Sequence, residues 1–172
     1  MRIRLARNQA ERLVSSLGVP GPPIDVIRVA LALGVQVKDA DLGDDVSGLL
    51  LTKGEAKVIF VNSDHSERRK RFTIGHELGH LYLAHQFEAG DHVHVDRGIS
   101  ISQRGARAST GEDPKEVEAN QFAACLLMPS QLVREEAERR HRLDEDDVVA
   151  MADEFNVSVQ AMTIRLTALG LL

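Results

Sequence analysis

The five residues His-Glu-Leu-Gly-His at 76–80 constrain this chain more than any other segment. A capping pattern at 64–67 predicts that a helix begins just before them. Residues four apart lie on one face of a helix, with Cβ atoms about 5–6 Å apart. His76 and His80 can therefore reach one zinc ion, which binds imidazole nitrogen at about 2.0–2.1 Å. Glu77 is rotated by about 100° around the helix and is placed to hold a water molecule instead.

This arrangement of residues favours the hydrolysis of peptide bonds. Zinc lowers the pKa of its bound water to about 7 and polarises a carbonyl group. A neighbouring carboxylate can take the proton of that water and pass it to the leaving amine, which makes Glu77 the predicted catalytic residue. Gly75 and Gly79 each destabilise a helix by about 1 kcal/mol relative to alanine, which indicates that another backbone approaches closely.

The third metal ligand has to come from outside this helix. A longer zinc motif would need a glycine at 83 and a histidine at 86, where the chain has Leu83 and Gln86. The segment 113–128 is apolar around most of its circumference, which predicts a buried helix. Glu116 and Asn120 share one face of it, so Glu116 is the predicted ligand and Asn120 the support of a ligand histidine.

Other residues remain candidates for this position. Glu116 could instead complete a capping box with Asp113, and Glu118, on another face of the same helix, is the second candidate ligand. The third group of candidates consists of three histidines that follow His80 in the sequence, namely His85, His92 and His94. These rank lower because lone histidines in loops are more often solvated than bound to a metal.

Two segments together resemble a known family. They are RFTIGHELGH at 71–80 and EVEANQFAACLLMP at 116–129, and they closely resemble the ImmA/IrrE family of intracellular metallo-endopeptidases, with a resemblance spanning Asn8 to Pro129. The resemblance implies a compact zincin-like fold, with Zn²⁺ bound by two histidines and the glutamate that matches Glu116. It also implies that Glu77 is the catalytic acid and base.

The order of the predicted elements favours an α+β fold with a small, mostly antiparallel sheet. Residues 1–129 are expected to form the zincin-like metallopeptidase domain, and residues 130–172 a helix-turn-helix-like subdomain packed on it. The predicted helices are 8–18, 24–33, 64–85, 113–128, 130–140, 144–155 and 158–169. The predicted strands are 35–38, 47–52, 57–61, 92–95 and 99–101, the second and third of which form a hairpin around Lys53-Gly54.

Composition excludes several classes of protein and site. Cys125 is the single cysteine, which excludes an internal disulfide and a cysteine-cluster metal site, and its apolar neighbours predict a buried thiol. The net charge of −5 and one basic residue, Arg165, in the last helix argue against direct nucleic-acid binding. The chain lacks an apolar run of about 18 residues and a signal-peptide pattern at its start, so we expect a cytoplasmic protein without a membrane partner.

The function expected from these features is zinc-dependent, limited regulatory proteolysis of a protein inside the cell. By family resemblance, the expected substrate is a helix-turn-helix (XRE-type) transcriptional repressor, cleaved in a stress response or a mobile-element or toxin–antitoxin circuit. One alternative is a non-catalytic zincin-like regulator or antitoxin-type protein that binds a partner or DNA through its C-terminal helices. Another alternative is a zinc-stabilised structural domain, which is less favoured because Glu77 would have no function in it. Tyr82 and His85 are further candidates for stabilising the oxyanion.

Overall fold

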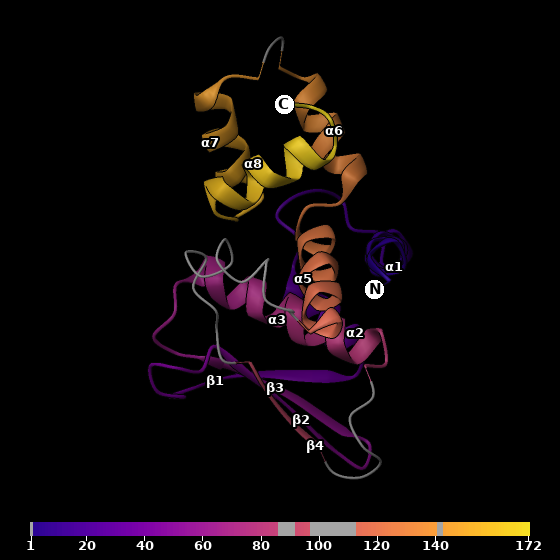
Figure 1. The fold of residues 1–172 in the computed structure, drawn as a ribbon, viewed down its shortest axis with the longest axis vertical. Coiled ribbons are helices and arrows are strands. Elements are labelled where there is room, and N and C mark those ends of the chain that lie inside the picture. The colour runs from indigo at the N-terminus through magenta and orange to yellow at the C-terminus, as the bar shows by residue number, and fades with distance from the viewer. Residues whose placement is uncertain (1, 86–91, 97–112, 141–142) are drawn as a thin grey trace.

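The computed structural model describes residues 2–85, 92–96, 113–140 and 143–172, and over them the chain has the expected α+β fold (Figure 1). The described helices are α1 (Ile3–Ser16), α2 (Val26–Ala32), α3 (Glu67–Tyr82), α5 (Pro114–Leu127), α6 (Ser130–Glu138), α7 (Glu145–Glu154) and α8 (Val159–Ala168). The strands are β1 (Val35–Ala40), β2 (Gly48–Lys53), β3 (Ala56–Asn62) and β4 (His92–Asp96). The strand predicted at 99–101 lies outside the described residues.

The four strands form one sheet in the order β1-β3-β2-β4. β2 and β3 are the predicted antiparallel hairpin, in which Gly54 takes a φ of +58° that suits glycine. β4 is antiparallel to β2 and β1 is parallel to β3, so the sheet is mostly antiparallel, as expected. Leu50 is paired with Ile59 on one side and with His94 on the other. Paired residues project to the same face, so His94 shares a face with two buried core residues.

Helices α3 and α5 pack closely against each other beside the sheet (Figure 1). A Cβ atom added to Gly79 would lie 3.1 Å from the Ala119 Cα atom, and one added to Gly75 would lie 3.2 Å from the Ala123 Cβ atom. The close approach expected from the two helical glycines is therefore confirmed. It brings the two segments that carry the candidate site residues together.

Helix α1 corrects one sequence prediction. The pattern at 8–11 predicts a helix start, but the helix begins at Ile3 and residues 8–11 lie inside it. The reason is tertiary, because the Glu118 carboxylate of α5 accepts a hydrogen bond from the Arg2 backbone N–H at the start of α1. Ala6, in the additional N-terminal turn, is fully buried. Contacts with α5 thus extend the helix beyond its local signal.

Helices α6, α7 and α8 form the end of the molecule opposite the sheet (Figure 1). Arg165 of α8 is 7% exposed. Its Nε atom donates to the Met128 carbonyl at 2.8 Å, and its Nη2 atom lies 2.8 Å from the Glu11 carboxylate. Arg68 of α3 also lies 2.5 Å from Asp153 of α7. These contacts attach the C-terminal helices to α1, α3 and α5, while the domain boundary at residue 129 stays a prediction.

Candidate metal centre

The two motif histidines lie side by side on α3, within a stretch of eight consecutive buried residues at 73–80. The Ser66 side chain caps the helix by accepting a hydrogen bond from the Arg69 N–H. His76 and His80 are 3% and 1% exposed, and their Nε2 atoms are 3.0 Å apart. The i, i+4 spacing thus places both Nε2 atoms at one point beside the helix, as the sequence predicts.

Glu116 brings a carboxylate from α5 to the same point. Its Oε2 atom lies 3.2 Å from His76 Nε2, and its Oε1 atom lies 3.3 Å from His80 Nε2. Metal–ligand bonds of about 2.0–2.1 Å at tetrahedral angles separate ligand atoms by about 3.3 Å. The spacing between the two imidazole nitrogens and the carboxylate oxygens therefore fits a metal ion, and the three residues form a His-His-Glu group that could hold one.

The surroundings of Glu116 bear on the alternatives raised by the sequence. The Asp113 side chain caps α5 by accepting from the Lys115 N–H, while the Glu116 carboxylate faces the histidines. The Asn120 Oδ1 atom lies 3.1 Å from His76 Nδ1, where it can fix the orientation of that ring. The contacts of Glu116 are thus those of a ligand candidate rather than of a capping residue.

Two of the other ligand candidates, Glu118 and His85, contact each other outside the His-His-Glu group. Glu118 lies with its Oε2 atom 3.2 Å from His85 Nε2. The Nδ1 atom of His85 is 3.1 Å from His80 Nδ1, at the edge of that ring away from Glu116. The donor atoms of neither residue join the His-His-Glu group, and the side chain of His92 lies outside the described part of the chain.

Glu77 is fully buried beside the His-His-Glu group. Its Oε2 atom lies 3.1 Å from His94 Nδ1, whereas its Oε1 atom has no hydrogen-bond partner among the described residues. A buried carboxylate oxygen without a protein partner needs a water molecule or an ion. Gly48 of β2 lies beside this oxygen, since a Cβ atom added there would be 3.6 Å from it, an ordinary contact distance.

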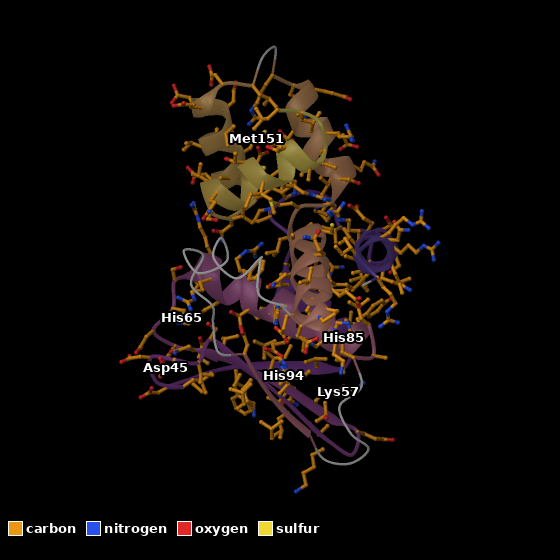
Figure 2. All side chains as sticks on the ribbon, viewed as in Figure 1. Asp45, Lys57, His65, His85, His94 and Met151 are labelled. Carbon is orange, nitrogen blue, oxygen red and sulfur yellow. The ribbon has the colours of Figure 1, made fainter. Side chains whose placement is uncertain are left out.

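Two residues of β4 join the site in ways that the sequence reasoning missed. His94, which the sequence placed in the third group of ligand candidates, bridges the two carboxylates, with its Nε2 atom 3.5 Å from Glu116 Oε1. Asp96 offers an oxygen within 4.8 Å of donor atoms of both His76 and Glu77. Figure 2 labels His94 on the sheet side of α5 and His85 at the lower end of that helix. The alternation in 92–95 could have placed His94 on one face of a strand, but no local signal gives the strand its partner.

The charges of these groups depend on one another. Burial raises the pKa of Glu77, so this carboxylate binds a proton more readily than an exposed one. Burial opposes the charge of Glu116, but its hydrogen bonds to His76, His80 and His94 outweigh this effect and hold its pKa far below the usual range. Burial lowers the pKa of His80 to about 4, which favours the neutral imidazole that binds metals. For His94, hydrogen bonds to Glu116 and Glu77 outweigh burial and raise the pKa to about 10.

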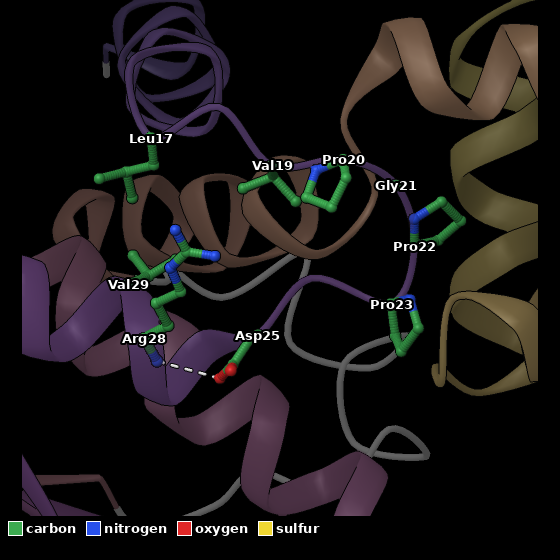
Figure 3. Close-up of a pocket in the computed structure, with 9 residues that line it drawn as sticks. All are labelled: Leu17, Val19, Pro20, Gly21, Pro22, Pro23, Asp25, Arg28 and Val29. Atoms are coloured by element: carbon green, nitrogen blue, oxygen red, sulfur yellow. Dashed lines mark hydrogen bonds between the residues drawn. The ribbon is translucent and has the colours of Figure 1, made fainter.

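Other features of the sequence take structural roles. Tyr82, a candidate for oxyanion stabilisation, packs its ring on Phe122, with 5.6 Å between the ring centroids. Cys125 is buried, as predicted. A pocket of about 450 Å³ lies at the 17–29 link (Figure 3), but it contains none of the site residues, and the Asp25 carboxylate in it caps α2.

Comparison with known proteins gives a family match and a shared fold. The profile of the peptidase M78 family, described as the IrrE N-terminal-like domain, matches residues 30–167. No curated protein matches the chain. Eight chains of solved structures match, and one is a Mycobacterium tuberculosis transcriptional regulator with a TM-score of 0.62 and 18% identity. That match covers 95% of this chain and only 46% of the regulator, and it shows a shared fold. Among the described residues, no helix is long and apolar enough to cross a membrane.

Proposed function

We propose that this chain, which belongs to the IrrE N-terminal-like family of metallopeptidases, is a zinc-dependent endopeptidase that carries out limited, regulatory cleavage of a protein substrate. The observation that carries the proposal is the His-His-Glu group with a buried glutamate beside it. Two imidazoles and one carboxylate are the protein ligands of many catalytic zinc sites, which keep a further position open for water or substrate. His76, His80 and Glu116 would hold the zinc ion.

Glu77 and His94 have separate roles in the proposed reaction. Zinc, when bound, polarises the scissile carbonyl and acidifies a water molecule. Glu77 takes the proton of the attacking water on its carboxylate and returns it to the nitrogen of the leaving amine. The raised pKa of Glu77 suits this exchange, because a proton has to be held between the two steps. His94 orients the Glu77 carboxylate through the 3.1 Å contact of its Nδ1 atom.

The proposed substrate is a helix-turn-helix transcriptional repressor, cleaved inside the cell in response to stress. Two observations support a regulatory role. The motifs at 71–80 and 116–129 resemble a family of intracellular regulatory proteases, and the chain shares its fold with a protein described as a transcriptional regulator.

Non-catalytic DNA binding through the C-terminal helices is less well supported. The one basic residue of α8, Arg165, is buried and paired with Glu11, so its positive charge is not accessible to a phosphate group. The first turn of α7 carries three acidic residues, Glu145, Asp146 and Asp147, which would repel a nucleic-acid backbone. These helices are better suited to packing on the domain or to contacting a protein.

The proposed function is tested by the substitution Glu77→Gln. We expect this variant to keep its fold and bind zinc while losing hydrolysis, because an amide cannot accept the proton of water. The readouts are zinc content by elemental analysis and cleavage of a protein-derived peptide library by mass spectrometry. Equal cleavage by the variant, or no cleavage of any peptide by the zinc-loaded wild type, would contradict the proposal.

The ligand set is tested separately by replacing each α5 glutamate. Glu116→Gln should weaken zinc binding sharply, since a neutral amide is a poor ligand beside two imidazoles. Glu118→Gln, on the same helix but outside the ligand group, is the comparison variant and should cause a much smaller loss. The reverse pattern in a zinc titration would transfer the ligand role to Glu118.

A further inference from the structure

His85 is placed by an unusual backbone turn at the end of α3. Ala84 has a φ of +49°, in a left-handed region that residues with a Cβ atom rarely adopt. The turn is closed by hydrogen bonds from the Ala84 N–H to the Leu81 carbonyl and from the His85 N–H to the His80 carbonyl. This is the pattern of a Schellman helix end, which usually has glycine at the left-handed position. This turn ends α3 and places the His85 side chain against His80.

The side chain of His85 contacts His80 with one ring nitrogen and Glu118 with the other. Its Nδ1 atom is 3.1 Å from His80 Nδ1, its Nε2 atom is 3.2 Å from Glu118 Oε2, and the residue is 2% exposed. When the Nε2 atom of His80 faces a metal, the proton of that ring lies on Nδ1 and is donated to Nδ1 of His85. His85 then carries its own proton on Nε2 and donates it to Glu118. Each ring is neutral, and each of these contacts has one donor and one acceptor.

The far end of this line of contacts is also anchored. Glu118 is 4% exposed and accepts from the Arg2 backbone N–H, and the Arg2 Nε atom lies 3.5 Å from its Oε2 atom. The Nδ1 atom of His76 is also supported by α5, but without an intervening residue, because it contacts Asn120 directly. Helix α5 therefore supports the outer nitrogen of both motif histidines, the first directly and the second through His85.

We propose that His85 and Glu118 are positioning residues that fix the ring orientation and tautomer of His80 for metal binding. This inference rests on the metal site of the proposed function, but it concerns how tightly the metal is held and not whether a peptide is cleaved. Hydrogen-bond partners behind a ligand histidine raise its basicity, and their loss typically lowers metal affinity by about 10–100-fold. Glu118 thus serves the site from behind His80, without being a ligand.

The experiment compares zinc affinity and fold stability among histidine variants of the full chain. Zinc dissociation constants are measured by competition with a chelator, and the unfolding of each metal-free variant is measured in urea. We expect His85→Leu to weaken zinc binding by about 10–100-fold. His85→Asn should recover most of that affinity, because its side-chain oxygen can accept the His80 proton near the position of Nδ1. His65→Leu, a histidine substitution before α3, is the matched control and should bind zinc like the wild type.

The comparison separates positioning from mere packing. Equal zinc affinity in His85→Leu and wild type would overturn the proposal. So would an affinity in His85→Asn as low as in His85→Leu, because the accepting atom would then be irrelevant. A chain that binds zinc with the expected variant pattern but cleaves no peptide would refute the proposed function and leave this inference supported.

Discussion

Replacing Gly79 with alanine tests whether the contact between α3 and α5 holds the site together. In an isolated helix this change would stabilise by about 1 kcal/mol, because glycine is a poor helix former. Here the new Cβ atom would lie 3.1 Å from the Ala119 Cα atom and 3.2 Å from both the Ala119 carbonyl oxygen and the Phe122 Cβ atom. These are closer than ordinary contacts, and the Ala119 atoms belong to the backbone of a buried helix, which cannot rotate away.

The expected magnitude follows from these two opposing effects. Overpacking a buried site destabilises by about 1–3 kcal/mol, and the gain in helix propensity offsets about 1 kcal/mol of this. We therefore expect a net loss of up to about 2 kcal/mol. For a chain of this size, 1 kcal/mol lowers Tm by about 2–4 °C. Glu116 lies three residues before Ala119, so separation of the helices should also weaken zinc binding.

The assay is thermal unfolding followed by circular dichroism, carried out in chelator so that metal binding does not contribute. Gly21→Ala is the control, because nothing lies within 4 Å of a Cβ atom at that position. A rise in Tm for Gly79→Ala would refute the reasoning, since propensity alone would then govern this position. An unchanged zinc affinity in a destabilised variant would refute the link between helix contact and site.

Three further outcomes are expected. Gly48→Ala should destabilise the fold, because its Cβ atom would lie 2.3 Å from Thr73 Cγ2. Thr73→Ser removes that methyl group and should restore much of the lost stability, as measured by urea unfolding in a double-mutant cycle. Ala84→Gly should not destabilise the protein in the same assay, because glycine relieves the left-handed strain at φ +49°, and a clear loss would contradict this. Burial raises the pKa of the Cys125 thiol, so the folded state binds its proton more tightly than the unfolded state, and stability falls as the pH rises past the ordinary value of 9.0. Cys125→Ala should flatten that fall, and an unchanged slope between pH 8 and 10 would refute it.

Most of the secondary structure could be predicted because its signals are local. Asp144 and Ser158, at which two helices are predicted to start, cap α7 and α8, and Lys53-Gly54 marks the hairpin between β2 and β3. The start of α1 could not be predicted in this way. The backbone N–H of Arg2 at its start donates to Glu118, a residue 116 positions further along the chain. The residues of α1 themselves give no indication of that contact.

The sequence by itself determined the histidine pair, because an i, i+4 spacing in a helix brings two imidazoles together whatever surrounds them. It also ranked the glutamates of one buried helix, Glu116 first and Glu118 second, above three histidines as candidates for the third ligand. Only the tertiary structure brought Glu116 to the pair and turned Glu118 toward His85, because the rotation of α5 against α3 is set by the close packing at Gly75 and Gly79. The approach of His94 to Glu77 was likewise decided by the pairing of β4 with β2. Local geometry depends on neighbours in the chain, whereas these contacts depend on how separate elements pack.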